Sequence, residues 1–221
     1  MKFGAIITAG GSSARFGSNK LLEKINDKTV IEYSVEAFLK SDIYEIIVCG
    51  GEYLEEVLCH SELVSESVKD KKIRFVNGGA VRQESVYNGL NAITCDYVLI
   101  HDGARPMITP EIIKKVKKEV VEKKAVSVMT KTVDTIKEVD QNGKIIRTID
   151  RSKLYNTQTP QAFEYNLIKS AHDKLKGQNY TDDCSMLEAS GYDVYMVEGD
   201  YRNIKITYPS DIELAKIYLN T

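Results

Sequence analysis

The sequence predicts an α/β protein built on a mostly parallel sheet with helices on both faces. Short apolar runs alternate with segments of helical periodicity along the chain, and this alternation is typical of parallel strands joined by crossover helices. Glycine-rich segments directly follow two of the apolar runs, at the edge where parallel sheets bind their ligands. Because 221 residues suffice for one well-buried core, we expect a single domain over residues 1–221.

The first part of the chain supplies three of the expected strands and one helix. Phe3–Ala9 is small or apolar on both faces, which indicates a buried strand. Val30–Leu39 has apolar residues at helical spacing and predicts the first helix. The apolar runs Glu45–Cys49 and Ile73–Val76 predict two more strands. The polar segment Glu62–Lys72 is expected to be a surface loop or mobile connection.

The alternation continues through the middle of the chain. Arg82–Ile93 is predicted to be a helix, and the apolar run Tyr97–Ile100 a strand. Pro110 then opens a Lys/Glu-rich helix that extends to about Lys124, since proline is favoured in the first helical turn. Ala125–Thr130 completes this part as another strand.

A β-hairpin arm is predicted at about residues 133–150. Val133–Val139 and Lys144–Ile149 alternate apolar and polar residues, and Asn142-Gly143 between them is a strong hairpin turn signal. Because an isolated two-stranded ribbon is marginally stable, we expect this arm to lie on the sheet edge or to reach a partner chain.

Composition and charge exclude several classes of protein. The 30 basic and 32 acidic residues give a net charge of −2, so no global basic field attracts nucleic acid. No apolar run has the length of a membrane span, and the N-terminus does not resemble a signal peptide, so we expect a cytoplasmic protein. The four cysteines are scattered and the three histidines are few, which favours reduced thiols over a disulfide framework or a zinc site.

The segment after the first strand, from Ala9 to Lys20, combines adjacent glycines with basic side chains. Gly10 and Gly11 let backbone N–H groups approach a ligand, and successive N–H groups in such a turn form an anion-binding concavity. Arg15 and Lys20 add positive charge. The segment indicates a triphosphate site, with an ordinary turn carrying solvated basic side chains as the alternative. It is not a P-loop, because Gly17 is followed by Ser-Asn-Lys.

A second glycine-rich segment, Gly78–Val86, leaves a strand and opens a helix. Arg82 and Ser85 therefore lie near a helix N-terminus, which favours anions and polar ligand edges. An N-cap region with surface charges is the alternative interpretation.

A third segment, Leu99–Pro106, ends a buried strand in Asp102. A carboxylate at this position can coordinate Mg²⁺, directly or through water. The alternative is a strand-end turn with an ion pair between Asp102 and Arg105. We expect His101 to be a packed, hydrogen-bonded histidine rather than a base.

Later segments place polar residues at element boundaries, and each is weak by itself. Thr181-Asp182-Asp183 either caps the helix that continues to Ser190 or contacts a polyol hydroxyl. Lys205 is predicted to lie in an apolar strand, where an unpaired buried lysine would be costly.

Together these segments resemble the 2-C-methyl-D-erythritol 4-phosphate cytidylyltransferases of isoprenoid biosynthesis, with the ribitol-5-phosphate cytidylyltransferases as close relatives. Each motif alone is weakly specific, but their order and spacing across nearly the whole chain are specific. The resemblance implies a Rossmann-like nucleotidyltransferase fold, CTP and Mg²⁺, and a homodimer with interlocked β-arms. The segments that carry it are Ala9–Lys20, Gly78–Ser85, His101–Pro106, Asp150–Ser152, Gln158–Gln161, Thr181–Asp183 and Asn203–Thr207.

The resemblance also implies roles for individual residues. The catalytic residues, which would hold the phosphates and stabilise the transition state, are Arg15, Lys20 and Lys205. The nucleotide would contact Ala9, Gly10, Gly11, Gly79, Arg82, Ser85, Asp102 and Gly103. Asp102 would lie near Mg²⁺, unless the CTP phosphates alone hold the metal. The alditol phosphate would contact Arg105, Thr135, Arg151, Thr159, Thr181 and Asp182, partly across the dimer from the arm.

The chain departs from the family pattern in three places, the mildest being His101–Pro106, where the family has His-Asp-Ala-Ala/Val-Arg-Pro. Asn19-Lys20-Leu21 stands where the family commonly has Pro-Lys-Gln, and Ala80 stands where an acidic residue is often seen. The segment Thr181–Glu188 followed by Gly191 looks more like the methylerythritol enzymes, so we expect 2-C-methyl-D-erythritol 4-phosphate as the acceptor.

Three alternatives to this function stay open. Within the enzyme class, the acceptor would be D-ribitol 5-phosphate or another alditol phosphate. An oxidoreductase or methyltransferase on a Rossmann-like sheet is disfavoured, because the G-x-G-x-x-G fingerprint is absent. A nucleotide-binding module that has lost turnover is the remaining rival.

Overall fold

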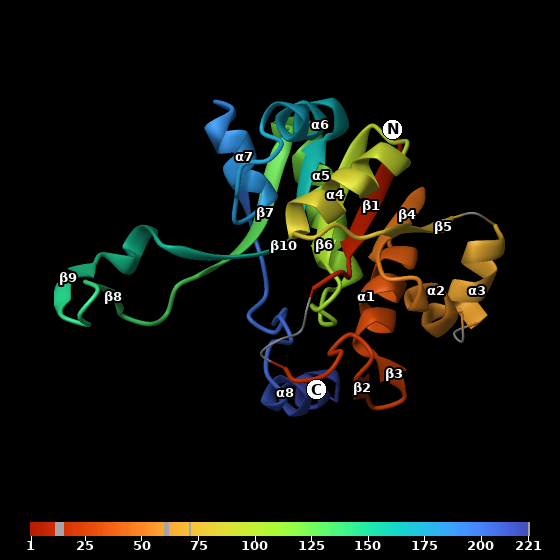
Figure 1. The fold of residues 1–221 in the computed structure, drawn as a ribbon, viewed down its shortest axis with the longest axis horizontal. Helices are drawn as coiled ribbons and strands as arrows, with labels where there is room; N and C mark the ends of the chain where they lie inside the picture. The colour runs from red at the N-terminus through yellow and green to blue at the C-terminus, as the bar shows by residue number, and fades with distance from the viewer. Residues whose placement is uncertain (12–15, 60–61, 71, 221) are drawn as a thin grey trace.

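A seven-stranded sheet forms the centre of the molecule in the computed structural model, which describes residues 1–11, 16–59, 62–70 and 72–220 (Figure 1). The strand order is β11-β7-β10-β6-β1-β4-β5. The strands are β1 (Phe3–Thr8), β4 (Glu45–Gly50), β5 (Ile73–Asn77), β6 (Tyr97–Asp102), β7 (Ala125–Lys131), β10 (Tyr155–Glu164) and β11 (Tyr195–Glu198).

Most neighbouring strands of this sheet run parallel, as predicted. β1 pairs in parallel with β4 and β6, β4 with β5, and β11 with β7. β10 is the exception, because it runs antiparallel to both β6 and β7. The register of β1 against β6 sets Thr8 beside Asp102, so the carboxyl ends of these central strands lie next to each other.

Helices cover both faces of the sheet and bury two apolar clusters. The helices are α1 (Val30–Leu39), α2 (Tyr53–Leu58), α3 (Glu62–Lys69), α4 (Arg82–Ala92), α5 (Pro110–Lys123), α6 (Tyr165–Lys174), α7 (Asp183–Ala189) and α8 (Ser210–Leu219). One cluster joins alternate residues of β1, such as Ala5 and Ile7, with α1, α5 and α8. The other joins Ile6 with α4, α6 and α7. This alternation along β1 is the arrangement expected of a strand buried on both faces.

The helix ends follow the local signals in the sequence. Thr29 and Glu32 form a capping box at the start of α1. At α5, Thr109 caps the helix and Pro110 occupies its first turn. A short hairpin of β2 (Lys24–Ile25) and β3 (Lys28–Thr29) leads into α1.

The prediction of a loop over residues 62–72 is wrong over Glu62–Lys69, which form helix α3. Val64 is fully buried, and Val68 packs against the same core cluster. These two valines are four residues apart and share one helix face, so a mostly polar helix docks through a narrow apolar stripe.

The predicted hairpin arm is present and projects away from the sheet (Figure 1). β8 (Ile136–Val139) and β9 (Ile145–Ile149) pair antiparallel as a separate sheet. Asp140 closes the turn by accepting backbone N–H bonds from Asn142 and Lys144, both at 2.9 Å. Gly143 has a φ of 80°, a conformation that glycine adopts at little cost. A 3₁₀ turn, η1 (Arg151–Lys153), follows the arm.

The cysteines are free, as predicted. Burial raises the pKa of the Cys49 and Cys95 thiols to about 12, which makes them unreactive packing residues. Over the described part of the chain, no helix has both the length and the apolar character needed to cross a membrane.

Candidate active site

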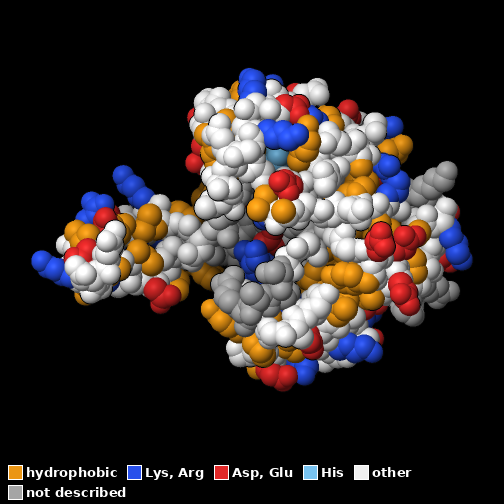
Figure 2. All heavy atoms as spheres, in the orientation of Figure 1, with side chains coloured by type: hydrophobic (Ala, Val, Ile, Leu, Met, Phe, Trp, Pro, Cys, Tyr) orange, Lys and Arg blue, Asp and Glu red, His pale blue; other side chains and the backbone are white. Residues whose placement is uncertain are grey.

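A cavity of about 420 Å³ opens at the carboxyl ends of the central strands. Figure 2 shows basic side chains lying in a hollow in the middle of this face. The described residues that line the cavity are Thr8, Ala9, Gly10, Gly11, Phe16, Lys20, Leu21, Ala80, Val81, Arg82, Ser85, Asp102, Ala104, Lys205 and Thr207. Three cations, Lys20, Arg82 and Lys205, line the cavity together with one carboxylate, Asp102, so the cavity favours an anionic ligand.

Three glycines bring separate turns together at the edge of this cavity. A Cβ on Gly78 would lie 3.5 Å from the Cα of Gly50 and 3.6 Å from the Cα of Gly10. The hydroxyl of Ser85 accepts from the N–H of Gly79 at 3.0 Å. This close packing places the turns after β1 and β5 side by side, with their backbone groups at the cavity.

Asp102 lies at the centre of a cationic cluster. Lys205 Nζ donates to Asp102 Oδ2 at 2.6 Å, and Arg82 Nε donates to Oδ1 at 3.2 Å. Arg105 Nε is 3.8 Å from Oδ2. Burial alone would raise the pKa of Asp102, but Arg82, Lys205 and Arg105 hold it well below its usual range. Asp102 is therefore ionised and orders the cations around it.

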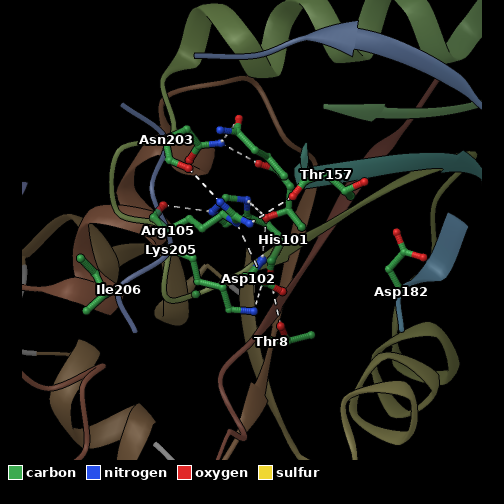
Figure 3. A network of polar contacts seen from close by, with 12 residues as sticks. Thr8, His101, Asp102, Arg105, Thr157, Asp182, Asn203, Lys205 and Ile206 are labelled. Carbon is green, nitrogen blue, oxygen red and sulfur yellow. Dashed lines mark hydrogen bonds and ion pairs between the residues drawn. The ribbon is translucent and has the colours of Figure 1, made fainter. Parts of the chain in front are cut away.

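The strand end that carries Asp102 is fixed by a hydrogen bond to Thr159, which also contacts His101. Figure 3 shows His101 and Asp102 side by side in this network. The Thr159 hydroxyl accepts from the Asp102 N–H at 3.0 Å and is 3.0 Å from His101 Nδ1. Burial lowers the pKa of His101 to about 4, so the ring is neutral. Because the carbonyl of Arg105, 3.2 Å from Nε2, can only accept, Nε2 carries the ring hydrogen and Nδ1 accepts from the Thr159 hydroxyl. His101 is a packed, hydrogen-bonded histidine, as predicted.

The segment after β11 brings Lys205 to the cavity. The prediction of a strand at Lys205 is wrong, because the residues around it form no strand. Asn203 is fully buried, and its Nδ2 donates to the carbonyl of Thr159 at 2.9 Å. The backbone N–H of Ile206 donates to the carbonyl of Ala104 at 2.8 Å. Lys20 approaches the same segment from the turn after β1, with its Nζ donating to the carbonyl of Ile206 at 2.8 Å. Arg15, predicted to act beside Lys20, lies outside the described residues.

Comparison with known proteins gives the same fold and covers the whole chain. The family model described as 2-C-methyl-D-erythritol 4-phosphate cytidylyltransferase matches residues 3–221. The chain belongs to this family. The proteins of that name from Caldanaerobacter subterraneus subsp. tengcongensis and Clostridioides difficile are each 41% identical. The alignments cover 99% of this chain, and 99% and 94% of those proteins respectively.

Solved structures agree with this assignment. The 4-diphosphocytidyl-2C-methyl-D-erythritol synthase of Anaerococcus prevotii superposes with a TM-score of 0.87 at 32% identity, covering 100% of this chain and 96% of that one. The 2-C-methyl-D-erythritol 4-phosphate cytidylyltransferase of Thermus thermophilus gives a TM-score of 0.79 at 27% identity, covering 98% of each chain. The predicted family and its nucleotidyltransferase fold are confirmed.

Within this cytidylyltransferase scaffold, the residues predicted for the nucleotide gather around one cavity. Those that line it are Ala9, Gly10, Gly11, Arg82, Ser85 and Asp102, together with the predicted catalytic residues Lys20 and Lys205. Gly79 adjoins the lining through Ser85. Gly103 is buried behind it, and a Cβ there would lie 2.6 Å from Ile31 Cδ1 and 3.0 Å from the carbonyl of Thr8. Gly103 therefore serves the close packing of α1 against the sheet.

The residues predicted for the acceptor are more dispersed. Thr135 and Arg151 are exposed at the arm, where Arg151 donates to the carbonyl of Val133. Arg105 and Thr159 stand behind Asp102 rather than in the cavity lining. These placements leave their roles toward an acceptor as predictions.

Thr181 and Asp182 mark the start of α7. Thr181 is exposed. Asp182 caps the helix, accepting from the Ser185 N–H at 2.9 Å, and its other oxygen accepts from Gln161 Nε2 at 2.6 Å. In Figure 3 it stands apart from the network around Asp102. Of the two roles considered for Asp182, a helix cap or a contact with a polyol hydroxyl, the structure shows the helix cap.

Sequence reasoning gave no role to several residues of the site. Phe16, Val81 and Thr207 line the cavity, but nothing in their type or spacing signals a ligand. Asp183 and His172 lie behind the cavity, where Asp183 accepts from Arg82 Nη1 at 2.7 Å. A contact between residues 101 positions apart has no local sequence signal.

Proposed function

We propose that this chain transfers the cytidylyl group of CTP to 2-C-methyl-D-erythritol 4-phosphate and releases pyrophosphate. The observation that carries the proposal is a cavity edged by two glycine-rich turns and lined by Lys20, Arg82 and Lys205, with Arg82 and Lys205 paired to Asp102. Such a cavity suits a nucleoside triphosphate, whose charge matches the cations and whose phosphates can approach backbone N–H groups. The full-length match to the cytidylyltransferase family supports CTP and the methylerythritol phosphate as its substrates.

The reaction needs charge stabilisation more than proton transfer. A phosphate oxygen of the acceptor attacks the α-phosphorus of CTP, a new P–O bond forms, and the bond to the pyrophosphate oxygen breaks. Because the acceptor phosphate is already an anion, no general base is required. The difficulty lies in bringing two anions together, so positioning and preorganised cations supply the catalysis. Lys20 and Lys205 act in this way, and the carbonyl of Ile206 holds Lys20 while the Asp102 carboxylate holds Lys205 and Arg82.

The residues of the site fit a magnesium ion held mainly by the nucleotide. Among the described residues, no group of three His, Cys, Asp or Glu side chains gathers to hold a metal. Asp102 is the carboxylate of the described lining, and its oxygens already accept from Lys205 and Arg82. Mg²⁺ is commonly bound by one or two carboxylates together with substrate phosphates. Asp102 would be the protein's ligand, and the bound ion would neutralise charge on the phosphate oxygens.

The arm supports a homodimer whose sites are shared between subunits. Val139, Ile145 and Ile146 on the arm are 54%, 58% and 57% exposed, and large apolar side chains exposed together on one projecting hairpin favour an interaction site. Docking onto a second copy would cover these residues and carry Thr135 and Arg151 toward the partner's acceptor site. We place the enzyme in the cytoplasm, where its nucleotide substrate is made.

The test is pyrophosphate release by the purified protein with CTP and Mg²⁺, using each of two acceptors. Release with 2-C-methyl-D-erythritol 4-phosphate, at a kcat/KM well above that with D-ribitol 5-phosphate, is the expected result. The reverse preference would keep the chemistry and overturn the acceptor. CTP binding without release from either would indicate a nucleotide-binding module.

A further inference from the structure

Two buried ionisable side chains take no direct part in the reaction proposed above. Asp183 opens helix α7, and His172 lies in α6. Both side chains are 1% exposed. Since an unpaired buried charge is costly, the partners of these groups indicate what the pair does.

Asp183 bridges His172 and Arg82. Its Oδ2 accepts from Arg82 Nη1 at 2.7 Å, and its Oδ1 lies 3.1 Å from His172 Nε2. The backbone N–H of Asp183 donates to the buried side chain of Gln161 at 3.1 Å. Both oxygens of the Asp183 carboxylate and its backbone N–H therefore have partners. These contacts fix the position of the carboxylate that Arg82 contacts.

The guanidinium of Arg82 donates hydrogen bonds from two of its edges. Nη1 donates to Asp183, and Nε donates to Asp102 Oδ1 at 3.2 Å. Burial would lower the pKa of Arg82, but Asp183 and Asp102 raise it, so the side chain stays charged. A planar guanidinium with carboxylates on two edges keeps one orientation, whereas one partner would leave it free to swing.

We propose that Asp183, oriented by His172, is a positioning residue that holds Arg82 in the nucleotide site. The inference rests on the proposed function, because it assumes that the cavity lined by Arg82 binds CTP. It also ties helix α7, which begins beside Thr181 and Asp182 on the expected acceptor side, to helix α4 on the nucleotide side.

The first test measures the contact itself, without any substrate. Arg82→Gln, Asp183→Asn and the double variant are unfolded in urea, and the three midpoints are compared with that of the unaltered enzyme. Each single variant removes the Arg82–Asp183 contact and leaves the other charged group with one partner fewer, so the double variant should lose clearly less than the sum of the two single losses. Losses that simply add would overturn the inference, because the two side chains would then act independently.

The second test measures CTP affinity by calorimetry and the kinetics by pyrophosphate release. Asp183→Asn should raise the Kd and the KM for CTP by about 10- to 100-fold, the range for losing one charged hydrogen bond. Its kcat should change by less than about threefold, because the catalytic lysines remain in place. An unchanged Kd for CTP would contradict the proposal.

A pair of variants at His172 separates orientation from packing. His172→Phe keeps a ring beside Tyr87, whose ring centroid is 6.3 Å away, but it removes the nitrogen that faces Asp183. His172→Gln keeps a donor there. The phenylalanine variant should weaken CTP binding and the glutamine variant should restore most of it. Equal CTP affinities in the two variants would rule out the orienting role.

Glu45→Gln is the matched control for a broken carboxylate–arginine pair. Glu45 accepts from Arg74 Nε at 2.8 Å at the amino end of β4, away from the cavity. This variant should lower the urea midpoint and leave the Kd for CTP unchanged. If the unaltered enzyme itself fails to bind CTP, the proposed function falls and the positioning role falls with it. If the unaltered enzyme binds CTP and Asp183→Asn binds it equally well, the positioning role alone is wrong.

Discussion

At the scale of single residues, the site depends on cations arranged around one buried carboxylate. Lys205 is held by Asp102 at 2.6 Å, and Lys20 by the carbonyl of Ile206 at 2.8 Å. Both ammonium groups are thus in place before any ligand binds, and preorganised charge contributes more to a transition state than charge that must be recruited.

Replacing either lysine should therefore affect turnover strongly. For Lys20→Ala and for Lys205→Ala we expect kcat to fall by about 10²–10³-fold, as for loss of one preorganised donor. Steady-state pyrophosphate release measures this. Lys216→Ala is the control, because Lys216 pairs on the surface of α8 with Glu213 and should leave kcat unchanged. Normal turnover of Lys20→Ala would remove Lys20 from the catalytic residues.

His101 should make the stability of the protein depend on pH. Its pKa is about 4 in the fold against an ordinary value of 6.5, mainly because of burial. Between these two values the unfolded chain binds a proton that the folded chain does not, so stability falls as the pH drops from about 6.5 to about 4. The shift corresponds to about 3 kcal/mol at most.

The variant His101→Gln isolates this contribution. A glutamine keeps a donor for the carbonyl of Arg105 but does not titrate. Urea unfolding at several pH values should show a flatter dependence between pH 4 and 6.5 in the variant than in the unaltered enzyme. Parallel curves for the two proteins would show that His101 does not carry the effect.

The sequence predicts the residues of the site that lie at the ends of elements. It misses the residues that contact the site only through another side chain. Asp102, Arg82 and the glycines each stand next to a predicted element boundary, so topology alone brings them together. Asp183 and His172 act through contacts with residues distant in the sequence. Asp182 illustrates a limit of another kind, because the same residue type serves equally as a helix cap and as a ligand contact.

At the scale of elements, helix α4 carries Arg82 and Ser85 and is pressed closely onto the sheet. Gly89 makes this approach possible, since a Cβ there would lie 2.8 Å from Ile6 Cγ2 and 2.9 Å from Cys49 Sγ. In an exposed helix, alanine in place of glycine would add about 1 kcal/mol of stability. Here the crowding of buried, inflexible neighbours opposes that gain.

Gly89→Ala should therefore destabilise the protein, because overpacking a core costs about 1–3 kcal/mol. Its urea midpoint should fall, and the KM for CTP should rise as α4 moves outward. Asn91→Ala, on the exposed side of the same helix, should be neutral or slightly stabilising. A Gly89→Ala enzyme as stable as Asn91→Ala would show that the sheet accommodates the extra methyl group.

Elements with strong periodicity are predicted well, and elements that are polar or interrupted are not. Val30–Leu39 is predicted to the residue. Strand β10 escapes prediction because Gln158, Thr159 and Gln161 are polar yet buried, and its pairing with β7 shifts register between Thr157 and Gln161. Helix α3 escapes because only a narrow apolar stripe marks it.

At the scale of the whole molecule, the arm and the cavity lie apart within one chain. Arg151 is exposed near the base of the arm, and the sequence pattern predicts the arm but cannot name what covers it. Burying the exposed apolar residues Val139, Ile145 and Ile146 would favour association of the arm with another protein surface. If the partner is a second copy, each site combines the cavity of one subunit with the arm of the other.

This arrangement predicts complementation between two inactive variants. An Arg151→Ala subunit keeps its cavity, and a Lys205→Ala subunit keeps its arm. When equal amounts are refolded together, random pairing places one intact site in each mixed dimer, so about a quarter of the full activity should return. Pyrophosphate release before and after mixing measures this recovery.

A matched mixture shows whether the recovery comes from shared sites. Lys20→Ala and Lys205→Ala both damage the same cavity, so mixing them leaves every site with one defect and should restore nothing. Recovery in the first mixture alone means that Arg151 acts across the interface. If both mixtures stay inactive while a dimer forms, Arg151 serves the cavity of its own subunit, and the arm then holds the dimer together without completing its sites.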